Sequence, residues 1–360
     1  MLDADSEYRE FRAEMNKLQS DVNQLRESAN IGYDADMDGS HNRVRQRIGR
    51  PRSGPGRGRG ARAKGPRRAA EPTGDIKLRL ALAHQAFELQ NYLEAKSIAF
   101  EIIRINAETY EAWTLLAGTF QELGDMDNAV MAYVIAAHFR PKIISSWLAA
   151  AKFALEETGE HRSKYFASVQ FCYAAAIRND PKNVDAHLGK AYIYLERGNS
   201  RLAVSEFKFV LEARPHDIQI IRSLAEAYVD QGEIQNAIDL YKETISHFKS
   251  TPEESDLFSW TDADVYSELY ASLGQHDLAI RELKSVARWL LGREDENFWD
   301  EVTYDDCEWD TDHSRRSRIP AFGLDNYALS SYGGGLPLDL RVKLGLYRLR
   351  LGHYDEAMVG

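Results

Sequence analysis

Residues 110–141 read YEAWTLLAGTFQELGDMDNAVMAYVIAAHFRP, and this pattern recurs along the chain with a period of 34 residues. If Ile76 is position 1 of the first unit, the next units begin at Tyr110, Ile144, Val184 and Ile218, and the third unit is six residues longer. Position 8 is alanine in all five units: Ala83, Ala117, Ala151, Ala191 and Ala225. Such conservation of spacing within one chain indicates a structural repeat.

Each shared position has a physical reason. Position 15 is glycine in three units (Gly124, Gly198 and Gly232), because the end of a helix that enters a tight turn needs a residue that tolerates a left-handed backbone. Position 20 is alanine in four units (Ala95, Ala129, Ala203 and Ala237), where two helices must lie close together. Proline at position 32 (Pro141, Pro181 and Pro215) ends the second helix because it lacks an amide donor.

These recurring positions, which we call the repeat columns, are typical of the tetratricopeptide repeat, a helix-turn-helix unit of about 34 residues. They predict an all-α fold: a right-handed superhelical solenoid of tetratricopeptide helix pairs with a disordered N-terminal tail. We expect an amphipathic helix in residues 1–30, an Arg/Gly-rich linker in 31–74, five repeats in 75–251, a divergent sixth repeat in 252–291, an irregular acidic loop in 292–337 and a truncated seventh repeat in 338–360. The incomplete last repeat suggests a fragment of a longer array.

Composition narrows the class of protein. The net charge is −11, but residues 41–70 hold ten Arg and one Lys without an acid, so the remainder carries −22. Cys172 and Cys307 show no metal-binding or redox spacing and suit a reducing compartment. No apolar run approaches the roughly 20 residues that cross a bilayer, and the N-terminus lacks the order of a secretory signal. We therefore expect a soluble, intracellular protein without membrane contact.

Two segments before the repeats could bind partners. Apolar side chains recur every three or four residues in the first 30 residues: Tyr8, Phe11, Met15, Leu18, Val22 and Leu25. The helix that they predict either folds back on the array, remains weakly ordered, or docks on a partner. The Arg/Gly tract contains Arg43, Arg45, Arg47, Arg50, Arg52, Arg57, Arg59, Arg62, Lys64, Arg67 and Arg68. It is a candidate nuclear localisation signal, nucleic-acid contact or solubilising linker.

Residues 294–312, EDENFWDEVTYDDCEWDTD, contain ten acids and no base. The simplest prediction for such a run is a solvent-exposed loop. Its interleaved aromatic residues also permit contact with a basic partner, or a lid that folds over the array. Cys307 and His313 do not match a usual metal site, because one thiol and one imidazole stand among hard carboxylates at irregular spacing.

Nothing in the sequence indicates catalysis, since hydrolase, zinc-protease, Walker and kinase motifs are all missing. We predict neither a cofactor nor a small-molecule substrate, and we interpret His138 and His187 as partly buried packing residues.

A solenoid instead binds proteins along the concave wall that the first helix of each repeat lines. The inward positions predict partner contacts at Lys77, His84, Phe87, Gln121, Leu148, Lys152, Leu155, Tyr192, Leu195, Arg222 and Glu226. Their apolar residues with flanking cations suit an amphipathic helix or an extended segment. A clamp for a C-terminal carboxylate is disfavoured by Leu80 and His84 in the first repeat, and some leucines could instead pack on the next repeat.

Two stretches carry a more specific likeness: GPRRAAEPTGDIKLRLALAHQAF at residues 65–87 and the repeat at residues 110–141. Together they resemble the tetratricopeptide-repeat subunit of transcription factor IIIC, the RNA polymerase III assembly factor, in its fungal form. The resemblance implies a nuclear scaffold near the internal promoter of transfer RNA genes. It also implies recruitment of transcription factor IIIB and contact with other transcription factor IIIC subunits.

Two other hypotheses remain open. A repeat scaffold for RNA processing or ribosome biogenesis would use the Arg/Gly tract to bind RNA. A repeat-containing glycosyltransferase would need a catalytic domain of Rossmann type after Gly360.

Overall fold

The computed structural model describes residues 74–156, 159–310, 314–320, 322 and 335–358. These residues form helices and connecting turns, and no strand occurs among them. The predicted N-terminal helix and the Arg/Gly tract lie outside this part of the chain. The chain divides into two compact units, residues 1–186 and 187–360.

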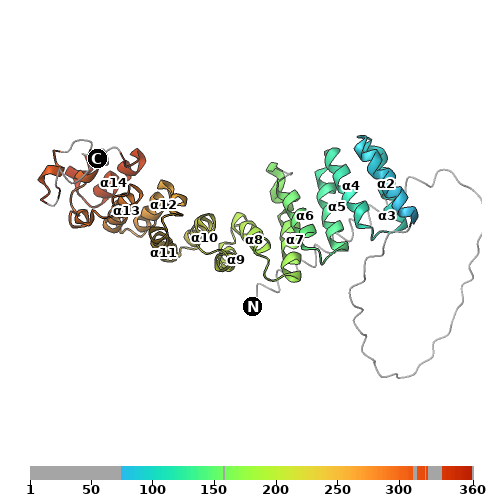
Figure 1. Ribbon diagram of the computed structural model, residues 1–360, viewed down its shortest axis with the longest axis horizontal. Coiled ribbons are helices and arrows are strands. Elements are labelled where there is room, and N and C mark those ends of the chain that lie inside the picture. Colours follow the sequence, from blue (N-terminus) through green and yellow to red (C-terminus); the bar gives the residue numbers. More distant parts are fainter. Residues whose placement is uncertain (1–73, 157–158, 311–313, 321, 323–334, 359–360) are drawn as a thin grey trace, which may run out of the picture. The chain divides into compact units, whose positions relative to one another are not determined.

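Helix pairs make up the first unit (Figure 1). Its helices are α2 (Gly74–Glu88), α3 (Tyr92–Ile105), α4 (Tyr110–Glu122), α5 (Met126–Phe139), α6 (Ile144–Glu156) and α7 (Phe166–Asn179). A 3-10 helix, Gly159–Tyr165, precedes α7 and accounts for the extra length of the third repeat. Consecutive helices pack against each other, from α2 on α3 to α6 on α7.

The second unit contains α9 (Ser200–Ala213), α10 (Ile218–Asp230), α11 (Ile234–Ser250), α12 (Trp260–Ser272), α13 (His276–Leu290), α14 (Leu338–Arg350) and α15 (Tyr354–Ala357). The division between the units falls in the first turn of α8 (Val184–Glu196). Helices α4, α6, α8 and α10 thus begin at the residues that open the repeats in the sequence. The predicted fold class, helix pairs of tetratricopeptide type, is confirmed.

A recurring indole contact stabilises the repeats of the first unit. Trp113 is buried in α4 and donates a hydrogen bond from Nε1 to the carbonyl oxygen of Ala107, at 2.8 Å. Trp147 in α6 makes the equivalent bond to Pro141, at 3.0 Å. Each indole therefore fills the core and also ties down the loop before its helix, so that neither the apolar ring nor its polar N–H is left unsatisfied.

The turn between the helices of a pair uses a left-handed residue. Gly124 has φ +76°, and the amide of Asp125 after it bonds to the carbonyl of Phe120 at 2.9 Å, as expected for the end of a helix. In the first repeat the same position is Gln90, with φ 61°. The first repeat therefore adopts the shared turn without the residue that best tolerates it.

The acidic segment departs from the sequence prediction. Residues 292–310 and 314–320 form turns and short 3-10 helices (Asn297–Glu301, Cys307–Trp309 and Arg316–Arg318), and part of their side chains are buried, including those of Trp299 and Trp309. Trp299 is 1% exposed and packs with Val302, Cys307 and Phe322 in a small core. The prediction of a solvent-exposed loop is wrong for the buried residues of this segment, whereas Glu294, Asp300 and Tyr304 do face solvent. The reason is the basic surface of α13 and α14, described below.

Candidate protein-binding surfaces

The predicted contact residues fall into two sets, one in each unit. The first-unit surface comprises Lys77, His84, Phe87, Gln121, Leu148, Lys152 and Leu155 on helices α2, α4 and α6. The second-unit surface comprises Tyr192, Leu195, Arg222 and Glu226 on helices α8 and α10.

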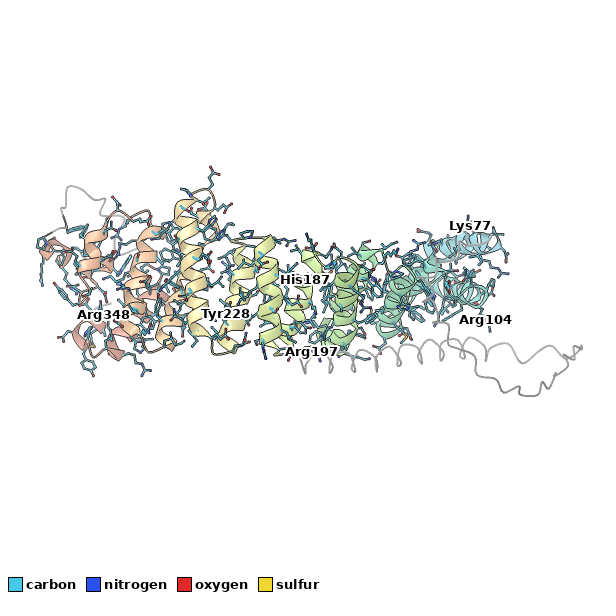
Figure 2. All side chains as sticks on the ribbon, turned by 90° about the horizontal axis from the view of Figure 1, so that it is seen from below. Lys77, Arg104, His187, Arg197, Tyr228 and Arg348 are labelled. Atoms are coloured by element: carbon cyan, nitrogen blue, oxygen red, sulfur yellow. The ribbon has the colours of Figure 1, made fainter. Side chains whose placement is uncertain are left out.

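Neighbouring first helices of the first unit lie side by side. Helix α2 contacts α4, and the ring of Phe87 packs against Gly118. A Cβ at residue 118 would lie 3.6 Å from this ring. Phe87 also meets Tyr92 edge to face, with ring centroids 5.4 Å apart. Phe87 is consequently half-buried and helps to hold the first repeat together, while His84 on the same helix is exposed. Lys77 on this helix is exposed as well (Figure 2).

Helix α6 adds an apolar patch beside a cation. Leu148 and Leu155 are half-buried, as is Gln121 on α4, so part of each side chain still faces solvent. The ammonium of Lys152 lies 3.7 Å from Glu156 one turn later, and both side chains are largely exposed. Such an exposed pair contributes little to stability. Lys152 is therefore free to exchange Glu156 for an acidic group on a partner.

In the second unit, Tyr192 joins α8 to its neighbours. Its hydroxyl lies 3.5 Å from Ser223 on α10, and its ring meets Phe207 of α9 edge to face, with centroids 5.3 Å apart. Leu195 is half-buried, and Glu226 on α10 is exposed. The first helices α8 and α10 are thus adjacent within this unit, as the repeat requires.

Arg222 has an internal role that the sequence did not reveal. Its Nε and Nη2 donate to the two carboxylate oxygens of Asp262, each at 2.6 Å, and Asp262 is 1% exposed. Burial alone would raise the pKa of Asp262, but hydrogen bonds from Arg222 and from Ser259 outweigh it and lower that pKa. Arg222 therefore neutralises a buried carboxylate at the start of α12, and only part of its guanidinium is open to solvent.

A group that we call the ionic cluster was also missed by the sequence analysis. It consists of Lys284, Arg288, Arg293, Arg348, Asp306 and Glu308, all of which are buried. Arg348 donates from Nε and Nη2 to the two oxygens of Asp306, at 2.7 Å each. Glu308 accepts from Arg288 at 3.1 Å and from Arg293 at 3.2 Å. One feature of the sequence could have indicated this cluster: the acidic run is flanked by Lys and Arg residues in the segments that form α13 and α14.

The same cluster borders a cavity of about 310 Å³. Lys284, Arg288 and Arg348 face it, and each of them is already bonded to a carboxylate. For Asp306, burial raises the pKa, but the bonds from Arg348 and Lys284 lower it overall. The cluster therefore works as a structural support for the acidic segment and offers no uncompensated charge to a ligand.

The remaining titratable candidates are packing residues. Burial lowers the pKa of His138, and the His187 ring lies 4.0 Å from that of Phe209 with Nδ1 2.5 Å from Glu206. Burial also raises the pKa of the Cys307 thiol to about 12, so that it is protonated at neutral pH. In the described part of the chain, no cluster of potential metal ligands occurs, and none of the helices has the length and apolarity to span a membrane.

Comparison with known proteins agrees with this architecture. Residues 172–204 and 190–254 match the tetratricopeptide repeat family. Similar helix arrays in solved structures include Naa15/Naa10 bound to HypK, at 15% identity and a TM-score of 0.44 over 79% of this chain and 35% of that one. Another is MamA, at 13% identity and a TM-score of 0.37 over 49% of this chain and 94% of that one.

Three curated relatives are more informative. "Transcription factor tau subunit sfc4" of Schizosaccharomyces pombe is 31% identical over 316 residues, which cover 84% of this chain and 30% of that protein. "Transcription factor tau 131 kDa subunit" of Saccharomyces cerevisiae is 24% identical, with 78% and 31% covered. The human "General transcription factor 3C polypeptide 3" is 27% identical, with 64% and 24% covered.

The chain spans less than a third of the length of each relative. All three relatives are subunits of transcription factor IIIC, which is called tau in the two yeasts. The chain is a tetratricopeptide-repeat protein whose sequence is similar to that of these transcription factor IIIC subunits.

Proposed function

We propose that the chain is a non-catalytic protein-binding scaffold of RNA polymerase III transcription and acts in the nucleus as part of a transcription factor IIIC subunit. The observation that carries the proposal is the 31% identity to a tau subunit over 84% of this chain. That similarity extends through the repeats and beyond them, so it exceeds what shared repeat columns alone require.

The first-unit surface supports binding of a protein segment. It combines exposed cations, Lys77 and Lys152, with the half-buried leucines Leu148 and Leu155. An amphipathic helix or extended segment with acidic residues beside apolar ones would complement this surface. We propose a component of transcription factor IIIB as the partner, with other transcription factor IIIC subunits bound elsewhere on the protein.

The test is a binding titration with purified transcription factor IIIB components. Reversing both exposed cations, Lys77→Glu and Lys152→Glu, should weaken binding roughly tenfold or more, because like charges would face each other across the interface. The matched control is Lys142→Glu, an exposed lysine in the loop between α5 and α6. Arg222 is not used, because its loss would leave Asp262 buried without a counterion. Equal affinity of the double variant and the control would contradict the proposed surface.

A second candidate function rests on the Arg/Gly tract. Eleven cations without an acid in residues 41–70 would bind a polyanion through release of counterions, as an RNA-processing scaffold requires. Deleting these residues should flatten the salt dependence of RNA binding and leave thermal unfolding of the repeats unchanged. Recovery of ribosome-biogenesis or splicing factors in place of transcription factor IIIB from nuclear extract would favour this function over the first.

A further inference from the structure

Helix α2 carries apolar side chains on a face that no described residue covers. Leu78 is 62% exposed and Leu82 is 48% exposed, and Leu89 lies just past the end of the helix. Their spacing of four and seven residues places them on one side of the helix. We call these three residues the α2 ridge. Helix α2 stands at one end of the first unit, with α3 and α4 packed against its other side (Figure 1).

The equivalent residues of other repeats are buried against a preceding helix pair. Thirty-four residues later, Leu78 and Leu82 correspond to Ala112 and Leu116, which are 0% exposed because α2 and α3 cover them. In the second unit the same columns hold Ile220 and Leu224, which are buried in α10 with α9 packed against that helix. In the second and fifth repeats, positions 3 and 7 therefore face the preceding helices. The first repeat has leucine at both positions, which suits a buried contact with another helix.

The chain contains a segment suited to that place. Residues 8–25 have an apolar side chain every three or four residues, and in helical form they would extend about 27 Å, slightly longer than α2. We propose that residues 8–25 pack as a helix on the α2 ridge, in the position that a preceding helix pair would occupy. This inference is independent of the partner proposed above.

Chain connectivity favours this occupant over an unlinked one. Residues 26–73 join the segment directly to Gly74, the first residue of α2. A random-coil chain of this length would have a root-mean-square end-to-end distance of about 40 Å, which is sufficient for a return to the neighbouring helix. Tethering of this kind gives an effective concentration on the order of millimolar, so that a modest apolar contact suffices.

Cross-linking in the whole 360-residue chain tests the proposal. The native thiols Cys172 and Cys307 are buried. The cross-linker should therefore react only with the cysteines that are introduced. Gln19→Cys, beside Leu18, is combined with Gln85→Cys, an exposed position within the α2 ridge face. A short bismaleimide should join them within one chain at least tenfold faster than it joins Gln19→Cys to the distant control Lys142→Cys, because docking raises the local thiol concentration.

Two further variants separate docking from chance proximity. Adding Met15→Ser and Leu18→Ser should reduce the cross-linking rate to that of the Lys142→Cys control, and should speed hydrogen exchange of α2 amides roughly tenfold. The polar-face pair Asn16→Ser and Asn23→Ser should change neither. Equal rates for Gln85→Cys and Lys142→Cys would overturn the proposal. Cross-linked dimers in place of monomers would also overturn it and identify a second copy as the occupant.

Discussion

The first unit and the C-terminal end of the second unit stack helices by different means. Among the described residues, every buried charged side chain lies between Asp262 and Arg348, whereas the buried polar residues of the first unit are only Thr109 and Thr119. The first unit packs alanine, tryptophan and other apolar side chains in repeating columns. Helices α13 and α14 instead hold the acidic segment through the ionic cluster.

Repeat stacking and charge pairing should therefore respond differently to mutation. An apolar column tolerates the loss of one contact at the cost of a cavity. A buried ion pair must be complete, because loss of one partner leaves the other as an uncompensated buried charge. The C-terminal end should therefore be more sensitive to single charge removals and to acid than the first unit.

The largest effect is expected from Asp306→Ala. The substitution removes the two carboxylate oxygens that accept from the buried Arg348, and one partner of Lys284, so it should lower the free energy of unfolding by about 3–5 kcal/mol. Urea unfolding followed by tryptophan fluorescence measures the loss. The control, Glu156→Ala, removes the exposed partner of Lys152 and should cost less than about 0.5 kcal/mol. Similar losses in both variants would contradict a special role for burial.

Trp113→Phe tests the apolar columns. It removes the bond to the carbonyl of Ala107 and leaves part of the indole volume empty, and the expected loss is about 2 kcal/mol. The half-buried Trp289 in the second unit serves as the control, and Trp289→Phe should cost about half as much. Thermal unfolding measures both, and an unchanged midpoint for Trp113→Phe would show that the indole contact is dispensable.

Acid should act on the second unit through Asp262 and Asp306, while Glu308, whose pKa is raised by burial, acts in the opposite direction. The pKa values of Asp262 and Asp306 are lowered in the folded chain, so the stability that these groups contribute is present above the pKa of the unfolded carboxyl, about 4. It is lost as the pH falls through the lower folded values. We therefore expect the free energy of unfolding to decrease as the pH falls below about 4.

Unfolding midpoints between pH 7 and pH 3 measure this dependence. The comparison with Asp306→Asn is decisive, because that variant cannot titrate at residue 306 and should show a shallower fall in stability. Parallel curves for the two proteins would exclude Asp306 as a source of the pH dependence.

The smallest effects concern the turns, where two substitutions should have opposite signs. Gly124→Ala places a Cβ at φ +76° and should cost about 1 kcal/mol. Gln90→Gly removes a Cβ at φ 61° and should stabilise the first repeat by a few tenths of a kcal/mol, because relief of strain slightly exceeds the added entropy of the unfolded chain. Differential scanning calorimetry compares them, and a destabilising Gln90→Gly would contradict the shared turn.

Much of the fold was predictable because the repeat is local. The columns placed the starts of α4 and α6 at Tyr110 and Ile144, where the structure has them, since glycine, alanine and proline act within a few residues of their own position. The predicted contact residues were located less completely. The sequence identified exposed Lys77 and Lys152, but it did not reveal the pairing of Arg222 with Asp262, which lies 40 residues further along the chain.

The sequence alone determined the helix pairs, their period and the likeness to transcription factor IIIC subunits, because each depends on the order of residues within one repeat. The burial of Trp299, Glu308 and Trp309 in the acidic segment depends instead on packing between distant parts of the chain. The partners of this segment, such as Arg348 with Asp306, are separated by 42 residues, and no periodicity links them. Whether a carboxylate faces water or a buried guanidinium depends on how α13, α14 and the turns between them pack, since desolvation and pairing act through space.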